Sequence, residues 1–459
     1  MRNQIDADEQ DEELVELKLT KSAWNSWVTS PNVYTRLKKL ELNGNGLTNL
    51  PDNLESTVPN IEILFLSDNE LGGIPKLSKL QSLRMISLRG NRVKELSSEN
   101  LPTKSLIWLI LTNNRIELIH PNVSALVNVR KLMLSHNRLK SIPEEIGGMA
   151  DLELIRLSNN ELCNSLPREL LTLPKLSWIS ISGNPIAIRP VTNKKEIPKE
   201  MVSYNKSQVL GLGASGTVYR GRFESKDVAV KIFKHDSRGS DGLAVDEVQI
   251  QQLVDHPLAV VANGIFLSND GKNYEGMVMD LLNNPEAIGL TPSFDTVTRD
   301  AGPSDAFQEL SWEDVCKVIW NVGSVLDQLH SSAKVSHSDV YLHNILSNNG
   351  IAMVSDFGAS FCYGDASHFE AIEVLAFGRL VEDLFAWFQG ISVPSTISNV
   401  GCFSGTQLEP LKEGQLKDLL GSILQPDQGK RPTFSEIMET LSRIPDFDCA
   451  QKAVENITQ

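Results

Sequence analysis

Residues 37–50 read LKKLELNGNGLTNL, and the same arrangement of leucines around one asparagine recurs along the chain as far as residue 186. The pattern is L-x-x-L-x-L-x-x-N-x-L-x-x-L/I, and its asparagine returns every 22 to 24 residues. The seven copies place this asparagine at Asn45, Asn69, Asn91, Asn114, Asn137, Asn160 and Asn184. Because chance does not readily produce seven phased copies, the pattern predicts a stack of repeated structural units.

Each copy is predicted to contribute one short strand. The alternate side chains of L-x-L, such as Leu40 and Leu42, would enter a shared interior, and the asparagine amide would bond backbone groups at the following turn. The pattern resembles leucine-rich repeats, which implies an α/β solenoid of seven repeats over residues 37–186. Residues 1–36 are then an acidic N-terminal segment with a possible cap, because the end of a solenoid must be shielded from water.

The strand residues that point away from this interior are unusually apolar. Alternation places the residue before and the residue between each inward pair on the concave face of the solenoid. An exposed sheet should be polar, but this face carries an apolar strip made of Phe65, Trp108, Ile110, Met133 and Trp178. We expect the apolar strip to bind a protein partner or a protein substrate. The alternative is that the second domain folds back over it.

The composition argues against several classes of function. The formal net charge of −15 disfavours binding to nucleic acid or to an anionic membrane, because both need clustered Lys and Arg. The 5 cysteines are scattered and form no C-x-x-C pair, so they predict neither a metal site nor a redox site. The acidic start resembles no secretory signal, and no window approaches ~18 apolar residues. We therefore expect a cytoplasmic protein without a membrane span.

The repeat ends near Pro185, and a glycine-rich stretch follows a linker predicted at residues 187–202. Residues 209–223 read VLGLGASGTVYRGRF, and residues 227–231 read DVAVK. A G-x-G-x-x-G pattern alone is equally compatible with a dinucleotide-binding turn, but here a strand rather than a helix follows it. In this context the stretch resembles the glycine-rich loop and third strand of protein kinases.

The resemblance implies an ATP site in this part of the chain. Glycines allow the backbone to approach phosphate oxygens, and a lysine supplies a point charge for them. Residues 245–257 have helical periodicity and present Glu247 where kinases place the acid that pairs with Lys231, so both are implied to be catalytic. Residues 276–282, GMVMDLL, resemble the strand that leads to the adenine-binding hinge. The residues implied to bind the nucleotide are Gly211, Gly213, Gly216, Val218, Ala229, Lys231, Asp280 and Leu282.

The most specific motifs are VSHSDVYLHNIL, residues 335–346, and MVSDFGAS, residues 353–360. Asp339 and Asn344 have the spacing of the kinase catalytic loop, and Asp356 begins a D-F-G sequence. The resemblance implies that Asp339 orients the attacking hydroxyl and accepts its proton. It also implies that Asn344 and Asp356 hold Mg²⁺ against the phosphates of ATP.

The resemblance extends over residues 203–445 and implies a two-lobed α+β domain. The N-lobe would occupy about residues 203–282 and the C-lobe about residues 311–445, with a long polar insert between them and a C-terminal tail at 446–459. The predicted fold is therefore multi-domain, a leucine-rich-repeat solenoid followed by a protein-kinase-like domain.

Several positions depart from the kinase pattern. Ser338 stands where many kinases carry an Arg that answers activation-loop phosphate, and Tyr341 stands where serine/threonine kinases usually place a Lys near the transferred phosphate. Few residues follow the D-F-G sequence before the next helical segment, which predicts an abbreviated peptide-docking platform. Arg431 normally pairs with an acid of a motif that is missing here, and either Glu370 or Glu373 could replace that acid. These features are similar to a subgroup of soluble leucine-rich-repeat kinases.

Two functions are compatible with this sequence. The first is an ATP-dependent protein kinase, acting on serine or threonine in signal transduction, whose repeats recruit its partners or substrates. The second is a pseudokinase that binds nucleotide and acts as a scaffold. We favour the first, because the positions that the chemistry needs are all present, namely Lys231, Glu247, Asp339, Asn344 and Asp356.

Overall fold

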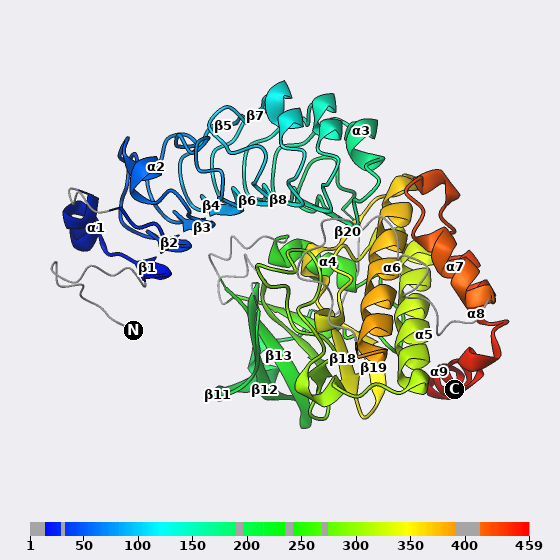
Figure 1. Cartoon of the computed structure of the whole chain (residues 1–459). Coiled ribbons are helices and arrows are strands. Elements are labelled where there is room, and N and C mark those ends of the chain that lie inside the picture. Colours follow the sequence, from blue (N-terminus) through cyan, green and yellow to red (C-terminus); the bar gives the residue numbers. More distant parts are fainter. Residues whose placement is uncertain are drawn as a thin grey trace.

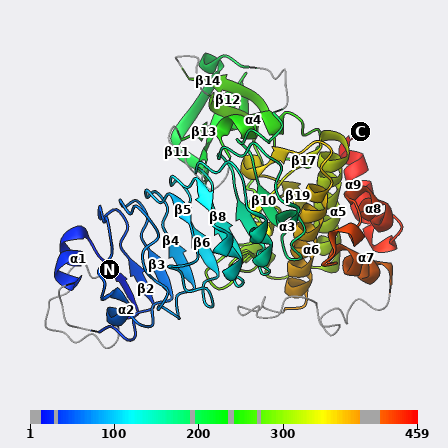
Figure 2. The same cartoon turned by 90° about the horizontal axis from the view of Figure 1, so that it is seen from above.

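The repeats and the second domain lie side by side, and the curved sheet of the repeats ends against the C-terminal lobe (Figures 1 and 2). Part of the predicted linker, residues 190–195, lies outside the described residues. The computed structural model of the chain describes residues 14–28, 33–189, 196–213, 215–234, 242–268, 274–390 and 414–458.

The repeats form one parallel sheet, as the pattern predicts. Each strand pairs in register with the strand of the next repeat, so that outward positions stack in columns along the concave face. One additional strand, β1, pairs with the first repeat in the place where the sequence suggested a cap. Short helices and turns cover the convex side, with α1 (Lys21–Val28) at one end and α3 (Arg168–Leu171) near the other. In spatial order the strands are β1 (Glu16–Lys18), β2 (Lys39–Glu41), β3 (Ile63–Phe65), β4 (Met85–Ser87), β6 (Trp108–Ile110), β8 (Lys131–Met133), β9 (Leu154–Arg156) and β10 (Trp178–Ser180).

The phased asparagines form a buried ladder between repeats. The side-chain oxygen of Asn69 accepts hydrogen bonds from the backbone amides of Asn45 and Leu47, both at 3.0 Å. Its amide group donates to the carbonyl oxygens of Leu42 and Leu66, both at 2.9 Å. The asparagines of the later repeats make equivalent bonds. Each asparagine therefore satisfies backbone groups that the turn leaves unpaired.

The N-lobe is a twisted antiparallel sheet with one helix, α4 (Ala244–Gln251), packed on it. Apolar residues from alternate positions of the central strands face this helix, as Ala229 and Met279 do, and both are buried. The strands, in spatial order, are β11 (Val202–Leu212), β12 (Gly216–Phe223), β13 (Lys226–Phe233), β15 (Tyr274–Asp280) and β14 (Ala262–Leu267).

The C-lobe is mainly helical, and short strands frame its active-site edge. The strands are β16 (Glu286–Ala287), β17 (Val335–Ser336), β18 (Ile345–Asn348), β19 (Ile351–Val354) and β20 (Phe361–Cys362). The main helices are α5 (Trp312–Gln328), α6 (His368–Phe388), α7 (Gln415–Ile423), α8 (Phe434–Leu441) and α9 (Asp448–Thr458). The segment expected to be a tail forms α9, and Ala450 of this helix is buried in the C-lobe core. Among the described residues, no helix combines the length and the apolar composition that crossing a bilayer requires.

The two domains share their hydrophobic cores. The last repeat is covered by β20 and the start of α6, because Phe361, Phe369 and Ile372 belong to the same buried cluster as the leucines of the repeats. A solenoid needs a cap at each end, and here the C-lobe provides the C-terminal cap. The multi-domain fold predicted from sequence is confirmed, but the two domains are packed as one body rather than joined only by a linker.

The concave face contributes to the shared core as well. Met133, Leu154 and Trp178 are buried in the cluster that forms the core of the C-lobe. Complete burial of one large apolar side chain stabilises a contact by about 1.5–3 kcal/mol, so these three residues hold the domains together by several kcal/mol. This contact is large and apolar enough to keep the relative position of the domains fixed.

Candidate active site

The glycine-rich hairpin joins β11 to β12, and its glycines have different surroundings. Gly211 has no atom within 4 Å of the position that a Cβ would take, so the backbone is open there. Gly216 is the opposite case, because a Cβ at this position would lie 2.5 Å from the carbonyl oxygen of Ile232. The amide of Gly213 donates to the carbonyl oxygen of Gly216 at 2.9 Å and closes the turn. Glycine at these positions therefore keeps the hairpin narrow and its backbone accessible.

Lys231 and Glu247 form a buried ion pair between β13 and α4. Their Nζ and Oε1 atoms are 2.5 Å apart, and the side chains are 10% and 2% exposed. The amide of Gln251 donates to the same Glu247 oxygen at 3.2 Å, one turn along the helix. The hydroxyl of Ser215 donates to the other oxygen of Glu247 at 3.3 Å. The pairing implied by the sequence is thus present, and it fixes α4 against the sheet.

The remaining positions implied for the nucleotide lie on β12, β13, β15 and the connection that follows. Ala229 pairs with Met279 across β13 and β15, and the half-buried side chain of Val218 packs beside them. Asp280 ends β15 opposite Val228, and its carboxylate accepts a hydrogen bond from the side chain of Asn263 at 2.7 Å. Leu282 follows in the connection to the C-lobe and is half-buried. The adenine-binding role that the resemblance implied for these residues stays a prediction.

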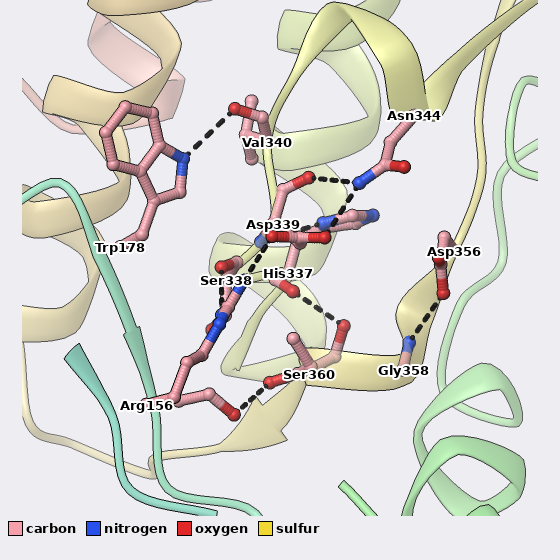
Figure 3. Close-up of polar contacts among 12 residues, drawn as sticks. Arg156, Trp178, His337, Ser338, Asp339, Val340, Asn344, Asp356, Gly358 and Ser360 are labelled. Carbon is pink, nitrogen blue, oxygen red and sulfur yellow. Dashed lines mark hydrogen bonds and ion pairs between the residues drawn. The ribbon is translucent and has the colours of Figure 1, made fainter. Parts of the chain in front are cut away.

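Asn344 and Asp356 fit a divalent cation of the magnesium type. The Nδ2 atom of Asn344 donates to the carbonyl oxygen and to Oδ2 of Asp339, both at 2.9 Å. These bonds use the nitrogen of the amide, so the side-chain oxygen of Asn344 faces away from Asp339. Asp356 is exposed, and its carboxylate accepts a bond of 3.3 Å from the amide of Gly358 (Figure 3). Mg²⁺ prefers oxygen ligands, of which a protein usually supplies one or two while phosphates and water complete the shell.

Asp339 lies at the centre of the catalytic loop and has partners from both domains. Arg156, on β9 of the repeats, forms an ion pair with Oδ1 of Asp339 and donates to the carbonyl oxygen of Ser338 at 2.8 Å (Figure 3). Burial alone would raise the pKa of Asp339, but the charge of Arg156 together with His343 and His337 holds this pKa below its ordinary value. Asp339 is therefore ionised at neutral pH, and its carboxylate can accept a hydrogen bond from a hydroxyl group.

Glu373, on α6, holds the backbone of the catalytic loop. Its carboxylate accepts hydrogen bonds from the amides of His337 and Ser338, at 2.9 and 2.5 Å, and from the ring of His330 at 2.6 Å. Glu373 is 2% exposed, so these bonds are shielded from water. The sequence drew attention to Glu373 only as one of two candidate partners of Arg431, and this role in the loop was missed.

Arg431 has a different environment from the one expected. Its guanidinium donates to backbone carbonyl oxygens, among them those of Ala371 at 2.8 Å and Gln425 at 2.7 Å. Glu373 is engaged by the catalytic loop, and the carboxylate of Glu370 accepts from the amide of Phe434 at 3.0 Å. Within the described part of the chain, no ion pair joins Arg431 to either acid. The prediction that Glu370 or Glu373 replaces the missing acid is therefore wrong. Backbone carbonyl groups bind Arg431 instead.

The polar insert supports the catalytic loop from the other side. Asp300 accepts a hydrogen bond from the amide of Leu342 at 2.7 Å and pairs with the ring of His343 at 2.5 Å. The neighbouring Arg299 pairs with Asp383 of α6 at 2.5 Å. The sequence indicated only a long polar insert between the lobes, and its role in holding the loop was not predicted.

The apolar strip on the concave face is divided by the contact with the C-lobe. Trp178 stacks on Tyr341 with ring centroids 4.6 Å apart, and its Nε1 donates to the carbonyl oxygen of Val340 at 3.2 Å. Trp178 and Met133 are buried in the C-lobe core. For these two residues the alternative prediction, that the second domain folds back over the strip, is therefore correct. The rest of the strip, Phe65, Trp108 and Ile110, is half-buried.

Family comparisons agree with this division of the chain. Residues 204–375 match the family described as "Protein kinase domain". Residues 35–93, 104–162 and 127–186 match the family described as "Leucine rich repeat".

Curated relatives match parts of the chain. A wall-associated receptor kinase-like protein of Arabidopsis thaliana is 30% identical over 309 residues, which cover 56% of this chain and 47% of the relative. A probable serine/threonine-protein kinase of Encephalitozoon cuniculi is 28% identical over 249 residues, covering 52% of this chain and 44% of the relative. A leucine-rich repeat-containing G-protein coupled receptor of Rattus norvegicus is 37% identical over 87 residues, or 19% of this chain and 10% of the receptor. The chain thus spans less than half the length of these relatives.

Proposed function

We propose that this chain, which combines leucine-rich repeats with a protein kinase domain, transfers a phosphoryl group from Mg·ATP to a serine or threonine hydroxyl of a protein. The observation that carries the proposal is the buried ion pair between Lys231 and Glu247, with its atoms 2.5 Å apart. Burying two charges is costly unless they are well paired, and a lysine held in this way at the edge of an open glycine-rich hairpin has a phosphate as its natural ligand. The kinase-named relatives support the same activity.

Each residue of the site has one task in this reaction. Lys231 places a positive charge at the phosphates, and the narrow hairpin at Gly216 brings backbone amides close to them. Asn344 and Asp356 would hold Mg²⁺, which when bound neutralises charge on the phosphate oxygens. Asp339 accepts the hydrogen bond of the acceptor hydroxyl and takes its proton as the hydroxyl oxygen bonds to the γ-phosphorus. The bond from that phosphorus to the bridging oxygen breaks in the same step, and ADP leaves.

The alternative is a nucleotide-binding scaffold without phosphotransferase activity. One observation favours it, namely the ion pair of Arg156 with the carboxylate that should receive the acceptor hydroxyl. The remaining lone pairs of that carboxylate support phosphotransferase activity instead. Each carboxylate oxygen can accept two hydrogen bonds, so the bonds to Arg156 and Asn344 leave capacity for a hydroxyl.

Transfer of label from γ-labelled ATP to casein, followed by phosphoamino-acid analysis, tests the proposal. Asp356→Ala should reduce transfer by at least about 100-fold, because the cation loses a ligand at the phosphates. Asp365→Ala is the matched control, since Asp365 is an exposed acid in the same segment, and it should leave transfer unchanged. Label transfer that survives Asp356→Ala contradicts the proposed mechanism. Binding of Mg·ATP by calorimetry without any transfer by the wild type would favour the scaffold.

We also propose that a protein substrate is recruited along the concave face beyond the C-lobe contact, beside Phe65 and the half-buried Trp108 and Ile110. Lys131 lies 4.2 Å above the ring of Trp108 and donates to the carbonyl oxygen of Val297 of the insert at 3.4 Å, so an aromatic ring and a positive charge mark the edge of this surface. The surface adjoins the catalytic loop through Arg156, which would place a bound segment near Asp339. The cytoplasmic location expected from the sequence stays a prediction.

A further inference from the structure

The catalytic loop carries no lysine or arginine at the two positions next to Asp339 that depart from the kinase pattern. Ser338 precedes Asp339, and Tyr341 follows it by two positions. The phenol of Tyr341 is buried, and its ring packs flat against Trp178 rather than facing the phosphates. Neither position of the loop can therefore supply a positive charge to the carboxylate.

The repeats place a positive charge beside the carboxylate of Asp339, namely the guanidinium of Arg156. Arg156 is the last residue of β9, on the concave face, and its side chain is 4% exposed. Its planar guanidinium holds two atoms of the loop at once, the carboxylate of Asp339 and the carbonyl oxygen of Ser338. A two-point contact of this kind fixes both the position and the rotation of the carboxylate, which a single ammonium would not do.

This contact belongs to the fixed part of the molecule. The residues on either side of Arg156 in the columns of the concave face are Met133 and Ser180. Met133 is buried in the C-lobe core, and the hydroxyl of Ser180 donates to the carbonyl oxygen of Ala359 at 2.6 Å. Release of Arg156 from Asp339 by domain opening would require separation of the shared core, so the arginine is present in the working enzyme.

We infer that Arg156 is a positioning residue of the phosphotransferase site, which holds the Asp339 carboxylate in the orientation that receives the acceptor hydroxyl. The inference rests on the proposed kinase activity. It makes the repeats part of the active site, in addition to any role in binding partners. Asp339 stays the residue that touches the substrate, and Arg156 acts through it.

The test compares Arg156→Gln and Arg156→Lys with the wild type in the full-length chain. Arg156→Gln should lower kcat by about 10- to 100-fold, as is typical when a preorganised polar group is removed from an active site, and should leave the Kd for Mg·ATP within about twofold. Arg156→Lys should recover part of kcat, because it restores the charge but not the two-point contact. Arg92→Gln is the matched control, since Arg92 is an exposed arginine of the repeats that pairs with Glu70 at 3.2 Å and lies outside the contact with the loop.

The conservative variant separates positioning from a general structural role. Partial unfolding would lower the amount of active enzyme without regard to the charge at position 156. A positioning role instead predicts that kcat falls in the order wild type, Arg156→Lys, Arg156→Gln, at an unchanged Kd for Mg·ATP.

A double-mutant cycle completes the test. In an Asp339→Asn background, Arg156→Gln should cause little further loss, because Arg156 acts through the carboxylate that is already neutral. Equal kcat values for Arg156→Lys and Arg156→Gln, or equal losses with and without Asp339, overturn the inference. Faster transfer by Arg156→Gln than by the wild type also overturns it, because Arg156 would then be a blocking group. Absence of transfer by the wild type itself identifies a failure of the proposed function instead.

Discussion

The buried carboxylate of Glu373 holds the backbone of the catalytic loop in place. It binds two consecutive backbone amides and the ring of His330 in a site closed to water. Burial opposes ionisation of Glu373, but the hydrogen bonds and the charge of His330 hold its pKa below the ordinary value of 4.5. Its contribution to stability is therefore fully present above about pH 4.5 and is lost as the pH falls through the lowered pKa.

Glu373→Ala should destabilise the protein by about 3–5 kcal/mol, because the substitution leaves a buried imidazole and two amides without their acceptor. Urea denaturation at pH 7 measures the loss. Glu439→Ala is the matched control, since this glutamate forms an exposed i,i+4 pair with Arg443 and should contribute almost nothing. A loss below 1 kcal/mol for Glu373→Ala would mean that the loop keeps its shape without this acceptor.

At the scale of the element, the insert between the lobes behaves as a strap that ties α6, the catalytic loop and the repeats together. Arg299 pairs with Asp383 and with Glu382 at 3.1 Å on α6. Thr298, one position earlier, bonds with Glu153 of the repeats, which itself pairs with Arg130 at 2.8 Å. The composition of this segment suggested only a polar connection, because the charges that it meets come from distant parts of the chain.

Removal of the guanidinium from this strap should be costly. Arg299→Met leaves the buried carboxylate of Asp383 without its cation and leaves Glu382 with Arg379 alone, at 2.9 Å, so we expect a loss of about 3–5 kcal/mol in the free energy of unfolding. Lys317→Met removes a cation from the partly exposed pair with Glu313 on α5 and should cost less than about 1 kcal/mol. Thermal denaturation of both variants beside the wild type makes the comparison, and equal losses would contradict the role of the strap.

At the scale of the whole molecule, the repeats and the kinase domain are expected to unfold together. The C-lobe covers the end of the solenoid, and the concave face fills part of the C-lobe core. Residues 1–190 alone would expose both surfaces to water. The repeats are therefore unsuited to act as an independent recruiting module, although the uncovered part of their concave face stays available.

Two tryptophans of the concave face provide a direct comparison. Trp178→Ala should lower stability by about 3–5 kcal/mol, because its side chain is 1% exposed in the shared core. Trp108→Ala should cost clearly less, since this side chain is half-buried beyond the C-lobe contact. Calorimetry should show one transition for the wild type, shifted to lower temperature in Trp178→Ala. Two separate transitions in the wild type would show that the domains unfold independently.

The sequence by itself determined the repeats and the kinase-like domain, and it supplied the candidate site residues. The period of the repeats fixed their strands, because each L-x-L must bury alternate side chains, and the motifs identified Lys231, Glu247, Asp339, Asn344 and Asp356, because these tasks need particular residue types at particular spacings. The pattern also placed Arg156 on the concave face. Nothing local indicated what that face would meet.

Only the tertiary structure decided how the two domains combine. The contacts that matter most, from Arg156 to Asp339, from Trp178 to Tyr341 and across the end of the solenoid, join residues far apart in the chain. Such contacts depend on complementary shape and on the exclusion of water when two surfaces meet, and these properties have no periodicity along the sequence. The apolar side chains of the concave face would also have suited a separate partner. In the folded chain, Met133, Leu154 and Trp178 pack against the kinase domain instead.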